Sequence, residues 1–188
     1  MKNIKDILKI YKQTGALLKG HFVLSSGLHS EIYLQSAIVL SIPKYLKIVS
    51  SALATSIEKS VKREFIDLIV SPAMGGVIIG SKVGEQLNKK AIFLERVNKK
   101  FKLRRGFRIE KNSRVLVVED VVTTGKSSLE CIKKIESYGG KIAAVASIVD
   151  RSEKKVELGT KFISLLKIHA PVFPNNNLPK KLKDIPVT

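Results

Sequence analysis

The stretch VLVVEDVVTTGKSS, Val115 to Ser128, places two acidic residues between an apolar run and a Gly-Lys-Ser turn. Gly-Lys-Ser also ends the phosphate-binding loop of many nucleotide triphosphatases. That loop requires another glycine five residues before Gly125, so that the backbone can wrap the phosphates. Asp120 occupies this position, and its carboxylate would repel a triphosphate. The stretch therefore excludes a nucleotide triphosphatase loop and indicates different phosphate chemistry.

A buried strand that runs into a turn and a helix predicts a monophosphate site. Backbone amides at the start of a helix bind phosphate groups. Further hydroxyl and ammonium donors come from Thr123, Thr124, Lys126 and Ser127. Glu119 and Asp120 disfavour phosphate, but they suit sugar hydroxyls and stabilise positive charge on a sugar. Simple helix capping by Thr and Ser does not call for two acids directly after a buried strand, so we predict a ribose 5-phosphate site.

Apolar runs alternate with helical patterns along the rest of the chain. From residue 65 onward we expect strands at 65–71, 91–95, 113–118, 141–149 and 161–168, and helices at 77–88 and 125–138. Strands built almost wholly of Val, Ile, Leu and Ala are covered on both faces, as in a mostly parallel α/β sheet flanked by helices. Upstream we expect a helix at 4–15, two short strands within 21–35 and a helix at 43–60. The Pro- and Asn-rich end, 170–188, is expected to be irregular.

In an open α/β sheet the ligand site lies beyond the carboxyl ends of the strands. Three segments follow such ends: PAMGG at 72–76, the basic RVNKKFKLRRGF at 96–107, and EDVVTTGKS at 119–127. We expect all three to project toward one edge of the sheet.

Composition limits the class of protein. The 188 residues, 44% of them hydrophobic, suit a single globular domain. The absence of an apolar run of about 20 residues and of a secretory signal predicts a cytoplasmic protein with no membrane contact. The net charge of +18 favours anionic ligands. The lysines are spread along the chain without interleaved aromatic residues, so we do not expect a nucleic-acid partner.

The single cysteine and the three histidines show no catalytic or metal-binding pattern. Cys131 cannot form an internal disulfide, and we expect it to be packed and inert. His21, His29 and His169 lack metal-ligand spacing, so we expect structural or surface roles for them.

VVEDVVTTGKS, residues 117–127, resembles the motif that binds 5-phosphoribosyl 1-diphosphate (PRPP) in the type I phosphoribosyltransferases. The resemblance implies that Glu119 and Asp120 hold the ribose hydroxyls and that the turn at 123–127 holds the 5-phosphate. SPAMGG, residues 71–76, is similar to the pyrophosphate-binding loop of these enzymes. The PRPP-binding residues implied by the two matches are Glu119, Asp120, Val121, Val122, Thr123, Thr124, Gly125, Lys126, Ser127, Ala73, Met74, Gly75 and Gly76.

Two further segments resemble orotate phosphoribosyltransferases. GHFVLSSGLHSEIYLQ, residues 20–35, is similar to the hood that covers the base, and LERVNKKFKLRRGF, residues 94–107, to the mobile catalytic loop. The likeness covers roughly residues 15–151. It implies the type I phosphoribosyltransferase fold: a single domain over 1–188 with a small N-terminal hood at about 1–40 and an α/β core at about 43–170.

The resemblance also implies a reaction, in which PRPP and orotate give orotidine 5′-monophosphate and pyrophosphate during UMP biosynthesis. The required Mg²⁺ is bound through PRPP and water and not directly by the protein. The implied catalytic residues are Arg96, Lys100, Lys102, Glu119 and Asp120. Those implied for orotate are Thr123, Arg151 and Tyr33, with the Arg151 guanidinium suited to a carboxylate. The mobile loop reaches a neighbouring subunit in this family, so the resemblance implies a homodimer with shared active sites.

This sequence departs from some family members, and two alternatives stay open. Lysines occur elsewhere at the positions of Ser25, Gly75 and Val97, and a histidine at that of Lys102. A lysine with an ordinary pKa near ~10 is a poor proton donor, so we interpret Lys102 as a neutralising charge. A purine or uracil salvage transferase would not need Arg151 for a carboxylate. A nucleic-acid-binding regulator of the same fold would not need the hood or the mobile loop.

Overall fold

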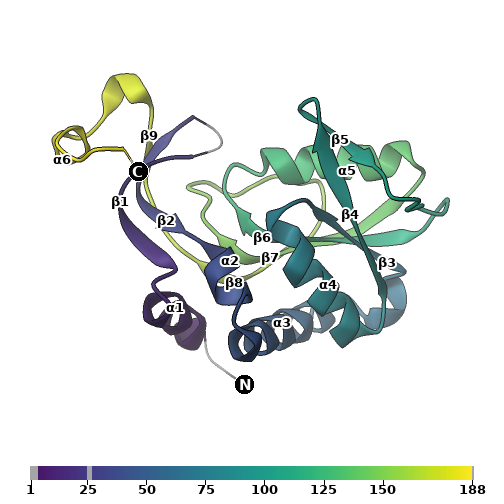
Figure 1. The fold of residues 1–188 in the computed structure, drawn as a ribbon. Coiled ribbons are helices and arrows are strands. Elements are labelled where there is room, and N and C mark those ends of the chain that lie inside the picture. The colour runs from purple at the N-terminus through teal and green to yellow at the C-terminus, as the bar shows by residue number, and fades with distance from the viewer. Residues whose placement is uncertain (1–3, 25–26, 188) are drawn as a thin grey trace.

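The computed structural model describes residues 4–24 and 27–187, which form an α/β core with a smaller hood at one end (Figure 1). Ser25, one of the departures above, lies outside the described residues. Within the described ranges, no helix has both the length and the apolar character that crossing a membrane requires.

The core is built on a six-stranded sheet in the order β5-β4-β3-β6-β7-β8. Neighbouring strands are parallel except at the antiparallel β4–β5 pair. The strands are β3 (Leu68–Pro72), β4 (Lys90–Val97), β5 (Lys100–Leu103), β6 (Arg114–Val122), β7 (Lys141–Asp150) and β8 (Phe162–Lys167). The predicted mostly parallel α/β sheet is therefore confirmed.

Helices cover both faces of the sheet, which explains the apolar strands. Along β6, Leu116 and Val118 pack in the cluster that also holds the buried faces of α3 and α4. Val115 and Val117 point the other way, into the cluster that contains Cys131 of α5. This alternation follows from the two-residue period of a strand, and it confirms that Cys131 is packed. The helices are α2 (Ser36–Leu40), α3 (Pro43–Glu58), α4 (Gly75–Leu87) and α5 (Lys126–Ser137).

The hood combines the two ends of the chain (Figure 1). Helix α1 (Ile4–Gln13) precedes an antiparallel sheet of β1 (Leu17–Val23), β2 (His29–Leu34) and β9 (Val172–Phe173) in the order β1-β2-β9.

The expected irregular C-terminal end is wrong in part. It contributes β9, the short helices η2 (Asn175–Asn177) and α6 (Lys180–Lys183), and a bridge from Val187 to His21. The prolines keep the regular elements short. Val172 and Phe173, which lie between two of the prolines, pair with the free edge of β2.

Two strand boundaries lie far from those predicted. The 65–71 strand begins at Leu68, because η1 (Arg63–Phe65) forms a turn first. The strand predicted to end at 118 continues through Glu119 and Asp120 to Val122, because β7 continues to pair with it as far as Asp150, although the pairing with β3 ends at Val117.

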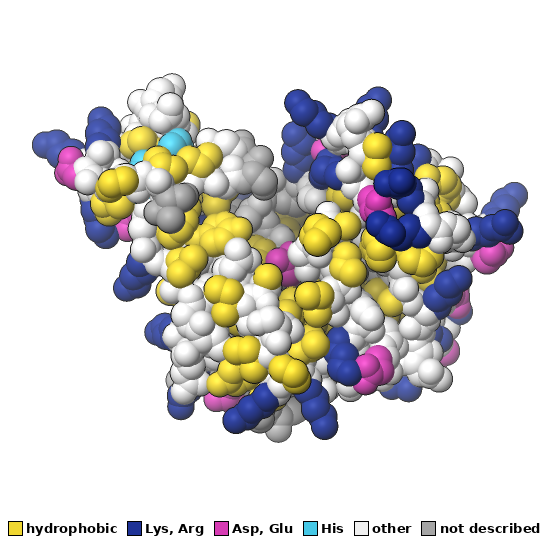
Figure 2. All heavy atoms as spheres, in the orientation of Figure 1, with side chains coloured by type: hydrophobic (Ala, Val, Ile, Leu, Met, Phe, Trp, Pro, Cys, Tyr) yellow, Lys and Arg dark blue, Asp and Glu magenta, His cyan; other side chains and the backbone are white. Residues whose placement is uncertain are grey.

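The basic segment predicted as a loop forms most of the β4–β5 hairpin. Asn98 and Lys99 at its tip have left-handed φ angles of 50° and 64°, as a two-residue hairpin turn requires. Phe101 is buried and Leu103 half-buried, and they alternate with exposed lysines. This two-residue period makes the segment a strand despite its charge. Basic side chains gather over the hairpin in the space-filling view, and the surface dips between the hairpin and the hood (Figure 2).

Candidate functional site

The two acidic residues at the end of β6 face opposite sides of the sheet. Glu119 lies under α5, is 6% exposed, and accepts a 3.4 Å hydrogen bond from Ser128 Oγ. Burial, assisted by the charge of Asp120, raises the pKa of Glu119 to about 8. Asp120 is half-buried on the α4 side, and burial raises its pKa against the opposing hydrogen bonds of backbone amides. The pair therefore presents one enclosed carboxyl and one accessible carboxyl at the sheet edge.

The PAMGG segment lies directly against the acidic pair. A Cβ at Gly75 would come within 2.5 Å of Asp120 Oδ1, and one at Gly76 within 2.7 Å of the Val118 carbonyl oxygen. The backbone of the segment can approach β6 only because these positions carry no side chain. The Ala73–Met74 peptide bond is cis, and Met74 is 86% exposed. A side chain at position 75 would therefore require the Asp120 carboxylate to move.

Residues 123–127, which we call the 123–127 turn, join β6 to α5. Gly125 is the N-cap residue of α5, with φ of 76°, and none of the described side chains caps this helix. A long 3.4 Å hydrogen bond from the Lys126 amide to Thr124 Oγ1 is the local side-chain contact. Apart from this long contact of the Lys126 amide, no described side chain caps the first turn of α5, and its remaining amides suit an anion.

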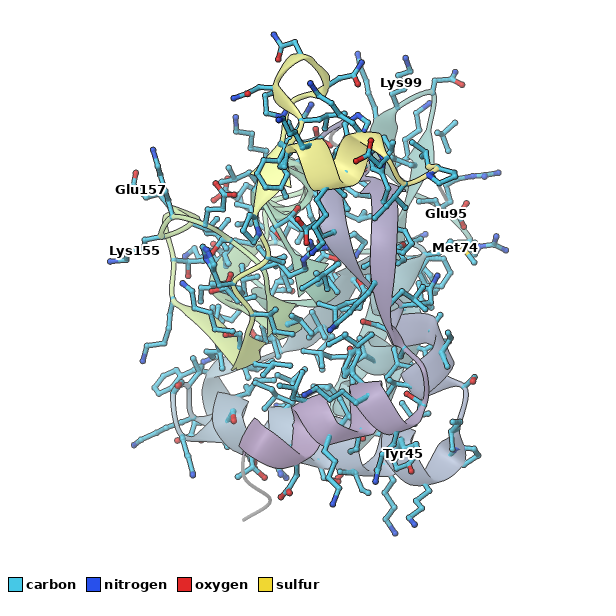
Figure 3. All side chains as sticks on the ribbon, turned by 90° about the vertical axis from the view of Figure 1, so that its left-hand side faces the viewer. Tyr45, Met74, Glu95, Lys99, Lys155 and Glu157 are labelled. Carbon is cyan, nitrogen blue, oxygen red and sulfur yellow. The ribbon has the colours of Figure 1, made fainter. Side chains whose placement is uncertain are left out.

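A cavity of about 450 Å³ lies beside the 123–127 turn and contains Arg151, so we call it the Arg151 cavity. Its wall is formed by Leu24, Leu28, Thr123, Thr124, Arg151, Ser152, Glu153, Lys154, Lys155, Val156, Glu157 and Val172. Figure 3 places Lys155 and Glu157 on one side of the molecule and Met74 and Glu95 on the other. Two residues of the cavity wall, Lys155 and Glu157, thus lie on the side of the molecule opposite Met74 and Glu95.

Arg151 is the enclosed cation of this cavity. Its side chain is 5% exposed, and Nη2 donates a 2.9 Å hydrogen bond to Ser30 Oγ. Nε is buried and has no hydrogen-bond partner among the described residues. Burial lowers the pKa of the guanidinium, and a buried charge with an open donor favours an anionic partner. Tyr33, the third residue predicted to contact the base, is not among the described wall residues and stacks on Phe22 at 5.5 Å.

The hairpin presents its basic residues on two faces. Arg96 packs over the Phe101 ring at 4.2 Å, pairs with Glu130 of α5 at 2.6 Å, and donates a 3.4 Å hydrogen bond to Ser127 Oγ. It therefore reaches the 123–127 turn of its own chain.

Lys100 and Lys102 are exposed and stand opposite Val97 and Glu95 in the hairpin register. This places them on the other face of the hairpin. The structure thus separates Arg96 from the two lysines that the sequence grouped with it.

The two hood histidines contact each other and lie apart from the wall of the cavity. His21 Nε2 and His29 Nδ1 are 2.6 Å apart, and His21 Nδ1 lies 2.9 Å from the Ile185 carbonyl oxygen. Both rings are buried, in agreement with the structural role expected for them.

Sequence reasoning missed several residues that support the site. Ser30 holds Arg151, Ser128 contacts Glu119, and Val156 packs where a Cβ at Gly125 would lie, at 2.2 Å. Ser30 lies in the quoted hood segment and could have been singled out there. The other two carry no local signal, because their partners are known only once the chain has folded.

A model of the phosphoribosyl transferase domain matches residues 35–180. The orotate phosphoribosyltransferase of Erythrobacter litoralis is 48% identical over 184 residues, which cover 98% of this chain and 95% of the relative. That of Caulobacter vibrioides strain NA1000 is 44% identical over 97% of this chain and 93% of its own length.

Solved structures show the same fold at lower identity. The Aeropyrum pernix orotate phosphoribosyltransferase superposes with a TM-score of 0.69 at 24% identity, covering 86% of this chain and 93% of that one. The adenine phosphoribosyltransferase of Thermoanaerobacter pseudethanolicus gives 0.61 at 21% identity, covering 73% and 88%. The fold alone is therefore shared by enzymes that are named for different bases.

Proposed function

We propose, because the chain belongs to the orotate phosphoribosyltransferase family, that its site transfers the 5-phosphoribosyl group of PRPP to N1 of orotate. The products are orotidine 5′-monophosphate and pyrophosphate, and the step belongs to UMP biosynthesis. The observation that carries this proposal is the Arg151 cavity, in which a buried guanidinium with an open Nε donor adjoins the 123–127 turn.

PRPP would lie along the edge formed by β6 and the PAMGG segment. The uncapped amides of α5 suit the 5-phosphate, and the accessible carboxyl of Asp120 suits a ribose hydroxyl. Glu119, enclosed under α5, would support the sugar from the opposite side of β6. The exposed backbone around Met74 is placed for the pyrophosphate. The C1–O bond to pyrophosphate breaks as positive charge develops on the ribose, and the two carboxyls stabilise that charge in their ionised form, which for Glu119 requires loss of a proton when PRPP binds.

Orotate would enter the Arg151 cavity with its carboxylate toward the guanidinium. A charge-assisted pair of this kind is strong in an enclosed site, and Thr123 in the same wall offers a hydroxyl to the base. Tyr33 would act from further out in the hood. A neutral purine or uracil would leave the Arg151 charge unpaired, which disfavours the salvage alternative.

Mg²⁺ fits this site as a substrate-bound ion. The described residues hold no group of three or more acidic, histidine or cysteine side chains that could bind a metal. Glu119 and Asp120 point to different faces, which suits hydroxyl contacts better than a shared ion. Bound through PRPP oxygens and water, Mg²⁺ would neutralise part of the charge on the leaving pyrophosphate.

The hairpin supports a homodimer in which sites are shared. Lys100 and Lys102 are exposed on the face opposite Arg96, while Arg96 is held against its own 123–127 turn. We propose that the two lysines neutralise pyrophosphate in the partner's site and that Arg96 serves its own. Closure of the hairpin would exclude water, which otherwise hydrolyses PRPP.

The direct test follows the loss of orotate absorbance after PRPP is added. One assay contains Mg²⁺, and a second contains EDTA in place of Mg²⁺. We expect Mg²⁺-dependent turnover of orotate and none of uracil, adenine or hypoxanthine. Turnover of a neutral base without turnover of orotate would favour the salvage alternative. The regulator alternative predicts no turnover, together with nucleic-acid binding that falls steeply with salt.

A further inference from the structure

One buried hydroxyl of the hood, that of Ser30, contacts the cation of the Arg151 cavity. Ser30, in β2, is 0% exposed, and its Oγ lies 2.9 Å from Nη2 of Arg151. The two residues are 121 positions apart in the chain. This contact joins the hood directly to the cation of the Arg151 cavity.

The hydrogen bonds of Ser30 fix the direction of this contact. Its single proton is directed to a backbone carbonyl, that of Ile32 at 3.0 Å or that of Pro171 at 3.4 Å. Its oxygen accepts from Arg151 Nη2 and, at 3.3 Å, from the Ile32 amide. A serine hydroxyl has one donor and two acceptor positions, so these contacts use its full capacity. A guanidinium cannot accept a hydrogen bond, so Arg151 is the donor and the Ser30 hydroxyl the acceptor in this contact.

The contact with Ser30 leaves another donor of the Arg151 guanidinium unpaired. Ser30 takes one donor of Nη2, while Nε stays buried and has no partner among the described residues. The backbone of Arg151 is also held, because its amide donates to the Val122 carbonyl at 2.8 Å. Because the backbone and one end of the side chain are fixed, the unpaired Nε–H group has a defined direction before any ligand binds. Such preorganisation favours ligand binding by reducing the loss of side-chain freedom.

We propose that Ser30 is a positioning residue, which orients Arg151 for the carboxylate of the base and so sets the KM for orotate. This rests on the proposed function. Ser30 touches no substrate itself. Its effect should therefore be confined to the carboxylated base and should disappear when the guanidinium is absent.

The test compares Ser30→Ala with Ser36→Ala. Ser36 is also buried in the same half of the molecule, where its hydroxyl meets Tyr11 Oη at 2.8 Å, so its loss measures the general cost of a missing buried hydroxyl. We expect Ser30→Ala to raise the orotate KM about 5- to 20-fold, with kcat and the PRPP KM within about twofold of wild type. Ser36→Ala should change none of the three.

A double-mutant cycle separates positioning from structure. In an Arg151→Met background, Ser30→Ala should raise the orotate KM no further. A full additional increase there, or an equal increase in the PRPP KM, would overturn the proposal. If Ser30→Ala does not fold, Ser30→Cys keeps the volume with a weak acceptor and should show the same selective rise; an unchanged orotate KM would count against the idea. Wild-type protein that fails to use orotate would instead overturn the proposed function.

Discussion

The 123–127 turn and the Arg151 cavity meet at Thr123, yet they are built in different ways. The turn is a contiguous stretch, held between the last strand residues of β6 and the first turn of α5. The cavity draws its wall from four separate segments of the chain, and its cation is fixed by Ser30, which lies two residues beyond Leu28 in one of them. A local motif carries its own geometry, whereas a composite cavity depends on how distant segments pack. Substitutions should therefore damage the two regions in different ways.

The largest effect is expected from Gly125→Ala in the turn. Gly125 has φ of 76°, and an added Cβ would lie 2.2 Å from Val156 Cγ1. The variant should weaken PRPP binding at least about 100-fold, because both backbone strain and the clash displace the phosphate-binding amides. Calorimetric titration with PRPP and Mg²⁺ measures this.

Gly139→Ala is the matched control for backbone strain. Gly139 has φ of 86°, but its nearest neighbour would lie 3.5 Å from the new Cβ. It should lower stability by about 1 kcal/mol and leave PRPP affinity unchanged. Adding Val156→Ala to Gly125→Ala should recover part of the binding. Wild-type affinity in Gly125→Ala would mean that the turn does not hold the 5-phosphate.

In the cavity, Arg151→Met should raise the orotate KM roughly 10- to 100-fold, the range for loss of a charge-assisted hydrogen bond. PRPP affinity should stay near wild type, since the turn does not depend on the guanidinium. Steady-state kinetics with each substrate varied in turn measures both. Arg63→Met, at an exposed arginine paired with Glu58, is the control for a lost surface charge. A parallel rise in the KM of both substrates would break the distinction between the two regions.

The same contrast explains how far the sequence alone could lead. The β6 strand, the 123–127 turn and α5 are adjacent in the chain, so apolar period and motif located them together. The PAMGG glycines were identified as a ligand loop, but their contact with Asp120 depends on the pairing of β3 with β6. Local pattern carries no information about such pairings when the strands are far apart in sequence.

Other features could not be predicted from the sequence, each for its own physical reason. The hairpin was predicted as a loop because its many charges masked the alternation of Phe101 and Leu103 with lysines. The strand at Val172–Phe173 is too short to show a period, and it forms because β2 offers a free edge. Ser30 lies in the quoted hood segment, but that segment does not show which of its residues contacts Arg151. Its importance comes from a guanidinium that reaches it from the end of β7.

The hairpin offers a smaller effect that tests sharing between subunits. Lys100→Ala should lower kcat about 10-fold by removing one charge from the pyrophosphate site, whereas Lys47→Ala on α3 should not. Asp120→Asn should disable the site in its own chain. If the lysine acts across a dimer, mixing equal amounts of the two variants should raise activity from about a twentieth to roughly a quarter of that of wild type, since half the dimers are mixed and each has one intact site. No recovery in verified mixed dimers would place the lysine in its own site.

The last effect is one on stability and concerns the enclosed carboxyl under α5. Burial raises the pKa of Glu119 from 4.5 to about 8, so the folded protein binds more protons than the unfolded chain between these values. The free energy of unfolding should therefore fall as pH rises from 5 to 8, by up to about 1.4 kcal/mol per pH unit for one proton. Urea unfolding without ligand at pH 5, 6, 7 and 8 measures the slope. Glu119→Gln should reduce this slope.

Asp67→Asn is the control with the opposite sign. Hydrogen bonds from Arg114 hold the pKa of Asp67 below its ordinary value of 3.8, so its contribution to stability is present above that value and lost only in stronger acid. Its removal should leave the slope between pH 5 and 8 unchanged. Equal slopes in wild type and Glu119→Gln would mean that Glu119 is ionised in the free protein. The carboxylate under α5 could then accept a hydrogen bond from a ribose hydroxyl without first losing a proton. PRPP binding would then release no proton from this site.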